Sequence, residues 1–357
     1  MSLFFLGGPT RLGAQNLGLG RGGLRVMTYN ADEGTDFLEV LNAHSLLEFL
    51  IGGGQIITNV PATNPPARMQ AIATQIIAAA PDLVSLQELV QWYTGPFDPV
   101  TQTCGPMTLQ FDMLQELLDA LAQQGAHYSL VVVAPQFAFG PLPGLIPPGT
   151  FLCAQVQNNI AILARTDLDP AKFQLSNVQS AQFKNLVYIP TPFGSLPEPR
   201  AWASVDVTFH GKSFRYIGTH LESFDAPTRE KQGAELRNGP ANTSLPIVIA
   251  MDSNAQAFPL PQDPTYMDFI AAGYNDAWAH LFPLAPGLTC CQAPLVNNPV
   301  SQLYQRIDLI LTLGNIEAKR IALFGADPST MTPAGLWPSD HAGVAARLTI
   351  DNDDDDD

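Results

Sequence analysis

Charged residues and long apolar runs are both scarce in this sequence. Charged residues make up 14% of the 357 positions and hydrophobic residues 46%, which excludes a disordered polyelectrolyte and leaves enough apolar side chains for a large core. No apolar stretch reaches the ~18–20 residues that span a bilayer. Residues 1–9 have no basic segment and too short an apolar run for a secretory signal. We expect a soluble globular protein; an exported protein whose signal peptide is absent from this sequence would look the same.

Basic residues are the scarcer charged type. The chain has 17 Lys and Arg against 33 Asp and Glu, a formal charge of −16. Six of the acids lie in residues 351–357, and the remaining chain still carries 17 basic and 27 acidic residues, a balance of −10. This composition lacks the basic stripe of a tight, sequence-independent nucleic-acid binder. We expect residues 351–357 to form a solvated tail, the alternative being a calcium-binding or partner-binding element.

Cysteine is rare and does not show the spacing of a zinc site. The four cysteines are Cys104, Cys153, Cys290 and Cys291. The first two could pair across a loop-rich region, and the last two are adjacent. An oxidising compartment is therefore allowed but not required.

Apolar spacing predicts helices and strands from residue 24 to residue 350. Residues 1–23 are Gly-rich without periodicity and are interpreted as a loose lead-in, and residues 24–350 as one domain, because polar signals come from both ends of the chain. Strands are predicted at residues 24–30, 81–88, 128–134, 159–165, 202–210, 213–221, 245–254, 306–311, 319–324 and 343–350. Helices are predicted at residues 36–50, 66–80, 109–124, 228–238 and 264–272.

The order of these elements predicts the fold class. Several strands are joined as hairpins, and the helices do not alternate strictly with strands. We therefore predict an α/β fold of two mixed sheets packed face to face with helices outside. Residues 135–152, rich in Pro, Gly, Phe and Leu without a period, are interpreted as an apolar loop that covers part of the core, a membrane or partner contact being the alternative.

Polar side chains follow most of the predicted strands. Residues 247–250 form a short apolar run that can be buried on both faces, and they lead into Asp252 and Asn254, whose side chains point the same way in an extended segment. The other polar residues at or beside strand ends are Asn30, Asp32, Glu88, Asn159, His220, Asp308, Asp340 and His341. Taken singly, each is better explained by a strand that enters a polar loop, or by a structural histidine.

Taken together, these residues indicate a metal centre. Clustered carboxylates in a low-dielectric setting are costly unless a cation is present. All-oxygen ligands suit Mg²⁺ or Mn²⁺ rather than Zn²⁺. Two histidines beside such a cluster can exchange protons at neutral pH. The set predicts metal-assisted hydrolysis of a phosphate ester, in which an ion held by Glu88 and its neighbours neutralises the phosphate and a carboxylate or histidine activates water.

The same segments resemble a known motif series. In chain order they are residues 28–32, 86–88, 159–163, 218–222, 251–254, 306–308 and 339–341. This series is similar to that of the endonuclease/exonuclease/phosphatase family, which includes deoxyribonuclease I, apurinic/apyrimidinic endonucleases, neutral sphingomyelinases and inositol polyphosphate 5-phosphatases. The resemblance covers residues 24 to 350, and residues 287–291, 306–308 and 336–341 look most like uncharacterised bacterial members, many of them exported.

The resemblance implies a deoxyribonuclease I-like four-layer sandwich with its site at one edge of the paired sheets. It implies a Mg²⁺ site, with Mn²⁺ as the alternative ion, in which Glu88 is the principal ligand and Asn30, Asp32 and Asp340 lie close to the metal. Asp252 is implied to orient or deprotonate water, Asn254 to contact phosphate, His341 to bind phosphate while paired by Asp308, and His220 to act as general acid. Asn159 and Arg200 are implied substrate contacts, a plain surface arginine being the alternative for Arg200.

The chain departs from the family pattern at its central strand. Met251 and Ser253 stand where the family has glycine and an aromatic residue, which puts substrate contacts in doubt but leaves the acids intact. The carboxylate that would hold His220 cannot be placed from the sequence.

Several substrates are compatible with this reading. The first expectation is a nuclease-type phosphodiesterase acting as a monomer on nucleic acid or a small phosphodiester. A lipid phosphodiesterase or a phosphatase, acting on a phospholipid headgroup or an inositol phosphate, is the alternative. A non-catalytic binding module is a third, and a calcineurin-like phosphatase is excluded because its motifs are missing.

Overall fold

The structure is a computed structural model that describes residues 23–191 and 194–351. The expected lead-in and acidic tail lie outside the described residues except for Gly23 and Asp351, so both stay predictions. Within the described part, no helix is long and apolar enough to cross a bilayer.

The first sheet contains the first strand of the described residues near its middle. Its strand order is β16-β17-β1-β2-β7-β3-β4, with β5 paired to β3 and β6 paired to β7. The strands are β1 (Leu24–Asn30), β2 (Leu83–Gln87), β3 (Gln91–Asp98), β4 (Thr103–Cys104), β5 (Thr108–Asp112), β6 (Tyr128–Ile146), β7 (Thr150–Arg165), β16 (Ile316–Phe324) and β17 (Gly343–Ile350). Because β1 and β2 are parallel, their carboxyl ends lie at the same edge of the sheet.

The second sheet has the order β14-β15-β13-β12-β11-β8. Its strands are β8 (Phe173–Gln182), β11 (Ala201–Phe209), β12 (Lys212–His220), β13 (Ile247–Asp252), β14 (Asn275–Asp276) and β15 (Asp308–Leu313). Here β12 and β13 are the parallel pair. A separate two-stranded sheet is formed by β9 (Val187–Thr191) and β10 (Gly194–Glu198).

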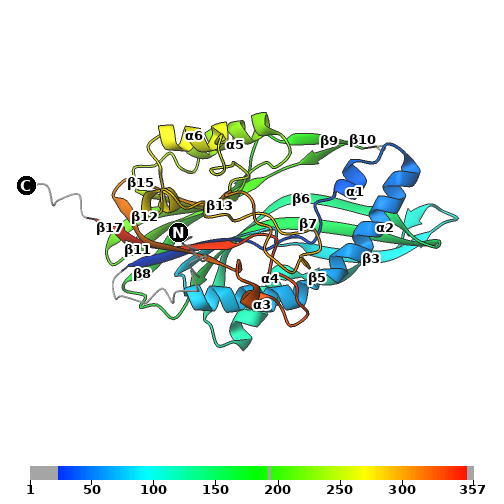
Figure 1. Cartoon of the computed structure of the whole chain (residues 1–357), viewed down its shortest axis with the longest axis horizontal. Helices are drawn as coiled ribbons and strands as arrows, with labels where there is room; N and C mark the ends of the chain where they lie inside the picture. Colours follow the sequence, from blue (N-terminus) through cyan, green and yellow to red (C-terminus); the bar gives the residue numbers. More distant parts are fainter. Residues whose placement is uncertain (1–22, 192–193, 352–357) are drawn as a thin grey trace, which may run out of the picture.

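The two sheets pack face to face between two layers of helices (Figure 1). Alternate residues of β1 face opposite ways: Val26 joins the apolar cluster between the sheets, and Met27 joins the cluster under the helices of the first sheet. The helices of that side are α2 (Leu46–Ala62), α3 (Pro65–Ala79) and α4 (Met113–Gln123), and those of the other side are α5 (Ala226–Asn238) and α6 (Pro264–Ala271). Shorter helices are α1 (Leu38–Leu41), α7 (Ala277–Leu281) and the 3-10 turn η1 (Pro328–Thr330). The predicted α/β sandwich of two packed sheets flanked by helices is confirmed.

The prediction of a loop at residues 135–152 is wrong. β6 continues to Ile146, and β7 begins at Thr150 and pairs with it. Within the described strands β6 pairs with β7 alone, so it can carry prolines that an inner strand could not. Register shifts between Pro135 and Ala138 and between Phe139 and Leu142 absorb the irregular positions.

Two predicted helices have different starts in the structure. The segment 36–50 is divided between α1 and α2, because Ser45 accepts a hydrogen bond from the amide of Glu48 and begins a new helix. The helix expected from residue 109 begins at Met113, because Asp112 caps it and the preceding residues form β5.

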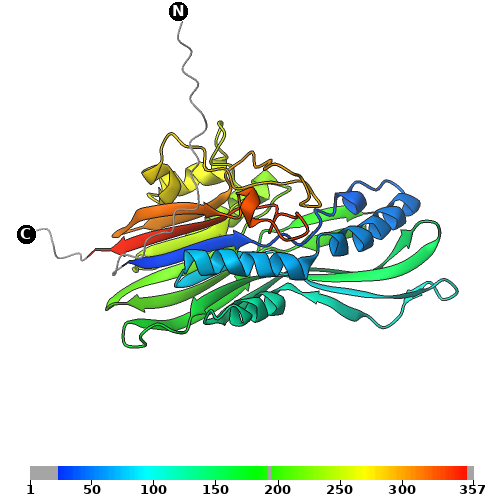
Figure 2. The same ribbon diagram turned by 60° about the horizontal axis from the view of Figure 1, so that its bottom comes forward.

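Glycines let α2 lie directly on the backbone of β6, and the two extend together beyond the sandwich (Figure 2). A Cβ atom at Gly54 would lie 2.0 Å from the carbonyl oxygen of Leu145, and one at Gly144 would lie 2.5 Å from the carbonyl carbon of Gly53. Such distances leave no room for even a methyl group. The contact matters for the site because α1, just before α2, lines the cavity described below.

We predict that Gly54→Ala lowers the free energy of unfolding by about 2 kcal/mol, because backbone must move to admit the methyl group. Urea denaturation followed by circular dichroism measures this change. Gly149→Ala is the matched control, since no atom lies within 4 Å of its Cβ position. Equal stability of the two variants would contradict the close contact between α2 and β6.

Candidate active site

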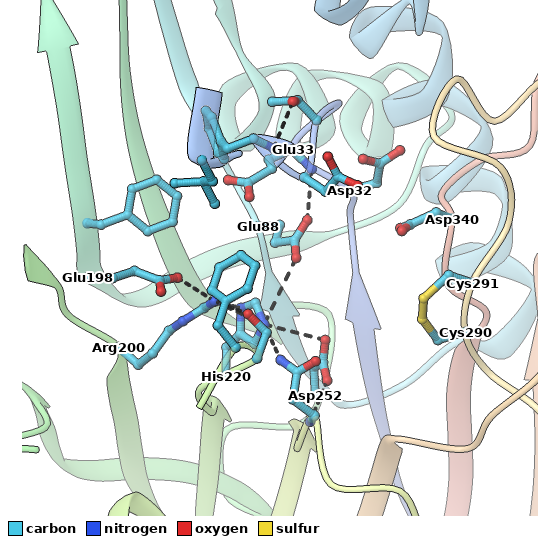
Figure 3. Close-up of a pocket in the computed structure, with 18 of the residues that line it drawn as sticks. Asp32, Glu33, Glu88, Glu198, Arg200, His220, Asp252, Cys290, Cys291 and Asp340 are labelled. Carbon is cyan, nitrogen blue, oxygen red and sulfur yellow. Dashed lines mark hydrogen bonds and ion pairs between the residues drawn. A yellow bond between two sulfur atoms is a disulfide. The ribbon is translucent and has the colours of Figure 1, made fainter. Parts of the chain in front are cut away.

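The register of both sheets brings the predicted polar strand ends together. In the second sheet His220 is paired with Asp252, and Asp252 is paired with Asp308. In the first sheet Asn30 is paired with Gln87, so that Glu88 follows directly at the same edge. Side chains from both sheets therefore point into one cavity (Figure 3).

The side chain of Asn30 joins the two sheets at this edge. Its Nδ2 donates to Glu88 Oε1 at 2.9 Å and to Asp252 Oδ2 at 2.9 Å. Its Oδ1 accepts from the amide of Asp32 at 2.9 Å. The other oxygen of Glu88 accepts from the amide of Glu33 at 2.9 Å. One amide group thus fixes two carboxylates that are distant in sequence.

His341 is held between three carboxylates. Its Nδ1 lies 2.8 Å from Asp308 Oδ2, which leaves Nε2 to face the cavity, 3.8 Å from Asp252 Oδ2 and 3.9 Å from Asp340 Oδ1. Ser339 positions the segment, because its hydroxyl donates to the carbonyl of Asn30 and accepts from the amide of His341.

His220 faces the same carboxylates from the second sheet. Its Nε2 lies 3.5 Å from Asp252 Oδ2 and 3.9 Å from Glu88 Oε1. Arg200 Nη1 lies 3.1 Å from each ring nitrogen, and Asn254 Nδ2 lies 3.0 Å from Nε2. Both neighbouring groups are donors, so the surroundings favour a neutral imidazole that accepts hydrogen bonds.

Three site residues adopt a left-handed backbone directly after or just beyond a strand. They are Asp32, Glu88 and Asn254, with φ angles of 60°, 56° and 48°. This region is unfavourable for residues other than glycine and is common where side chains are held for function. At each position the turn ends the strand and directs the polar group toward the cavity.

The proton affinities of the site follow from burial and from neighbouring charge. Burial raises the pKa of Glu88 and, well above its ordinary value, that of Asp340. Burial, and next the charge of Asp308, raise the pKa of Asp252 to about 6. Burial alone would lower the pKa of His341, but the three surrounding carboxylates together raise it well above its usual range.

His220 shows the opposite behaviour. Burial, together with the charges of Arg200 and His341, lowers the pKa of His220 well below its ordinary value. The two histidines therefore differ in proton affinity: their surroundings raise the pKa of His341 and lower that of His220.

Several groups of residues could hold a cation. The ligand atoms of Glu88, His220 and Asp252 lie within 4.8 Å of one another, as do those of Asp252, Asp308 and His341. Buried oxygens of Asp32 and Asp308 have no hydrogen-bond partner among the described residues, although Asp32 Oδ2 lies 3.4 Å from the guanidinium of Arg68. Crowded carboxylates that burial makes hard to ionise fit a divalent cation, which would favour their charged forms.

The cavity has a volume of about 340 Å³ and two unlike sides. The acids and histidines form one side. The other is apolar and comes from α1 and the residue before it, from β6, and from the β9–β10 pair, with Phe224 beside them. Its residues are Phe37, Val40, Leu41, Phe137, Phe139, Ile189, Leu196, Pro197 and Phe224. Phe37 packs edge-on against Phe137 at 5.8 Å between ring centroids.

Arg200 lines the cavity but is not free in it. Its Nη2 lies 2.6 Å from Glu198 Oε1 and donates to the hydroxyl of Ser223 at 2.9 Å. Burial raises the pKa of Glu198 to about 7 in spite of the arginine beside it. Any anion that binds Arg200 must therefore compete with an existing ion pair.

Asn159 is the predicted site residue that the structure directs elsewhere. Its amide donates to the carbonyl of Leu89 at 3.1 Å, and it is not among the described residues that line the cavity. The neighbouring Asn158 instead donates to Glu33 Oε2 at 2.6 Å. The other predicted site residues that line the cavity are Asp32, Glu88, Arg200, His220, Asp252, Asn254, Asp340 and His341, while Asn30 and Asp308 contact them from behind.

Sequence reasoning did not select three other residues that shape the site. Glu33 adjoins Asp32 in the same polar turn, and Glu198 lies two positions before Arg200, so proximity in sequence was the available signal. Arg68 lies on α3, and its guanidinium donates to the carbonyls of Ala31 and Asp32. Nothing in the sequence around Arg68 marks it, because its role depends on how α3 packs against the end of β1.

Comparison with known proteins yields matches in structure alone. No protein-family model matches the chain, and no curated protein matches it in sequence. An endonuclease/exonuclease/phosphatase family protein from Bacteroides thetaiotaomicron superposes with a TM-score of 0.56 at 17% identity, covering 93% of this chain and 99% of that one.

Two further structures agree with this match. A protein of the same family from Leptotrichia buccalis gives a TM-score of 0.55 at 13% identity over 91% of this chain and 99% of that one. A mannosyl-6-phosphatase of Bacteroides thetaiotaomicron gives 0.52 at 16% identity over 91% and 99%. The chain has the fold of the endonuclease/exonuclease/phosphatase proteins, which confirms at the level of the fold the resemblance inferred from its sequence.

Proposed function

We propose that this chain is a divalent-metal-dependent hydrolase of phosphate esters, acting on phosphodiesters. The observation that carries the proposal is the shared hydrogen-bond donor of Glu88 and Asp252, which draws a carboxylate from each sheet to one point beside His220 and His341. Such a set suits a cation, a water molecule and a phosphate in contact with one another.

Glu88 is the proposed principal ligand of a Mg²⁺ or Mn²⁺ ion, with Asp32, Asp340 and Asn30 close to it. A cation bound there would neutralise charge on the scissile phosphate. The carboxylates present support this assignment, because burial raises the pKa of both Glu88 and Asp340 and a positive charge is what such a cluster lacks.

Asp252 is the proposed group that orients and deprotonates the attacking water. Its Oδ2 faces both histidines, its Oδ1 accepts from the amide of Asn254, and its pKa of about 6 is suited to accepting a proton near neutral pH. Asn254 is proposed to contact the phosphate, although its Nδ2 is engaged by the carbonyl of Leu221 and by His220 in this state.

The two histidines are proposed to have different tasks. His341, cationic and oriented by Asp308, presents Nε2–H to the phosphate and stabilises the charge that develops on it. The general-acid role expected for His220 requires a protonated ring, which its surroundings oppose. We therefore propose that His220 stays neutral and accepts hydrogen bonds, on the side of Asp252 opposite His341.

The substrate class is inferred from what surrounds the phosphate position. Glu33, Glu198 and Asp36 add further carboxyl groups to the cavity, and Arg200, the single arginine among the described residues that line it, is paired with Glu198. These surroundings disfavour the polyanionic strand of a nucleic acid, so the nuclease-type substrate stays a prediction without support from the site.

The apolar side of the cavity favours the second substrate class named from the sequence. Ile189 and Leu196 of the β9–β10 pair line the same cavity as Phe137, Phe139 and the acids. A phosphodiester whose second ester group is an alkyl or aryl group would place that group there. Hydrolysis of a sugar phosphate monoester, the activity after which one structural neighbour is named, is the remaining alternative.

Glu88→Gln tests the metal assignment. The variant should lose about a hundredfold or more of its Mg²⁺-dependent rate on a bis-aryl phosphate while its circular dichroism spectrum is unchanged, because the amide cannot balance a divalent charge. Glu230→Gln, on the exposed surface of α5, is the control and should keep the full rate. Unaltered Mg²⁺-dependent turnover by Glu88→Gln would remove the basis of the proposal.

A series of p-nitrophenyl alkyl phosphates tests the substrate class. We expect kcat/KM to rise by about threefold to fourfold for each added methylene, the gain expected when a methylene group leaves water. Ile189→Ser should weaken this dependence without changing the rate on the methyl ester. Tyr188→Ser is the matched control, because Tyr188 is 63% exposed on the same strand and does not line the cavity. A kcat/KM that is independent of chain length, or lower than that on single-stranded DNA, would contradict the assignment.

A further inference from the structure

The wall of the cavity beside Asp340 contains two adjacent cysteines joined as a disulfide, Cys290 and Cys291 (Figure 3). The catalytic assignment does not use them. We propose that this pair, when reduced, binds a thiophilic cation such as Zn²⁺ together with His341, and that this second metal site switches off the hydrolase.

Distances support a three-ligand site. The two sulfurs and a ring nitrogen of His341 lie within 4.8 Å of one another. Zinc forms bonds of ~2.3 Å to sulfur and ~2.0–2.1 Å to histidine nitrogen, so tetrahedral ligand atoms stand roughly 3.5–4 Å apart. Small side-chain rotations can open the sulfurs to that separation once the bond between them is broken.

The backbone keeps the three ligands together whether or not the sulfurs are bonded. Cys290 and His341 face each other in an isolated antiparallel bridge. On one side of this bridge the amide of Gln292 donates to the carbonyl of Asp340 at 2.9 Å, and on the other the amide of Ala342 donates to the carbonyl of Thr289 at 2.8 Å. The site therefore does not depend on the disulfide for its position.

His341 already has the arrangement of a metal ligand. Its Nδ1 contacts the carboxylate of Asp308, which leaves Nε2 as the ligand atom. Histidines that bind metals commonly have such a carboxylate behind them, and it strengthens the bond. Asp340, 3.9 Å from the same Nε2, or a water molecule can complete four-coordination.

Thiolate ligands distinguish this site from the oxygen-rich Mg²⁺ site. Soft sulfur ligands select Zn²⁺ and similar cations, whereas carboxylates suit Mg²⁺. The oxidised pair offers no thiolate, so it binds neither class. His341 cannot bind zinc and contact the phosphate at once, so zinc binding should stop hydrolysis. This loss of activity rests on the proposed function, whereas metal binding itself does not.

The redox step can be written in full. A phosphine reductant attacks one sulfur, the S–S bond breaks, and water supplies the oxygen of the phosphine oxide and the protons of two thiols. Zinc then displaces both thiol protons to solvent and binds the sulfurs as thiolates. Cys291 is partly exposed, so the reductant can reach it.

The other disulfide, between Cys104 and Cys153, must be removed because its reduction would also produce thiols. Cys104 and Cys153 form a bond that joins β4 to β7, with 5.9 Å between their Cα atoms, and neither residue lines the cavity. A Cys104→Ser/Cys153→Ser parent therefore isolates Cys290 and Cys291 as the single reducible pair, provided that its circular dichroism matches the native chain.

Cobalt absorbance tests the site without reference to catalysis. After phosphine reduction and gel filtration without oxygen, the parent is titrated with Co²⁺, whose thiolate complexes absorb in the near ultraviolet. We expect one equivalent to produce this absorption, zinc to displace it, and reoxidation or Cys290→Ser/Cys291→Ser to abolish it. His341→Asn should weaken cobalt affinity about tenfold or more.

Two results with the parent and the double variant would overturn the proposal. One is the absence of thiolate absorption in the reduced parent, and the other is absorption that persists in Cys290→Ser/Cys291→Ser. The single variant Cys291→Ser gives a second measure that changes only the more exposed sulfur, and affinity equal to that of the parent would likewise contradict chelation by the pair. Failure of the phosphodiesterase assays would leave this absorbance unaffected, so the two proposals can fail separately.

Discussion

One amide nitrogen, Nδ2 of Asn30, donates to carboxylates that belong to different sheets, and the remainder of the site is arranged around this pair of hydrogen bonds. Asn30 ends β1 and is completely buried. Glu88 follows the parallel neighbour β2, and Asp252 ends β13 in the opposite sheet. The packing of the two sheets therefore determines the distance between the acids, and a shift of either sheet would separate them.

The same arrangement explains the unusual charge distribution of the site. Buried carboxylates are stable when cations or donors compensate them. Here the compensation is partial: Asn30 and backbone amides supply donors, and His341 supplies an imidazole whose pKa the surrounding carboxylates raise. Arg200 is engaged by Glu198 and Arg68 by the carbonyls of the β1 turn, so neither adds free positive charge. The deficit is what a divalent cation would correct.

The cavity combines this polar side with an apolar one that differs in origin. The polar side comes from the ends of core strands, whose positions the sandwich fixes. The apolar side comes from α1, the middle of β6 and the β9–β10 pair. Of these, α1, β9 and β10 lie to one side of the central strands (Figure 1). In the proposed function, chemistry and substrate selection would therefore belong to separate parts of the fold, as expected where variable elements surround a rigid scaffold.

The sequence was sufficient to predict which residues form the polar side of the cavity. It was insufficient to predict the apolar side and the irregular strand β6. An apolar run followed by a carboxylate is a local pattern, and parallel pairing brings Asn30 beside Glu88 in one sheet and His220 beside Asp252 in the other. That the two edges meet was implied by the family resemblance. Asn158 and Asn159 could not be told apart, because which of two neighbours in a strand faces the site depends on the phase of β7. The prolines of β6 led to the prediction of a loop, because an inner strand could not contain them. A strand at a sheet edge, such as β6, tolerates them.

Crystals soaked in Mn²⁺ and measured at the manganese absorption edge give the most direct test of a cation at the meeting point of the two sheets. The account predicts an anomalous peak about 2.0–2.3 Å from a carboxylate oxygen of Glu88, within reach of Asp32 or Asp340. A Mn²⁺ peak that avoids Glu88, or none at saturating Mn²⁺, would contradict it.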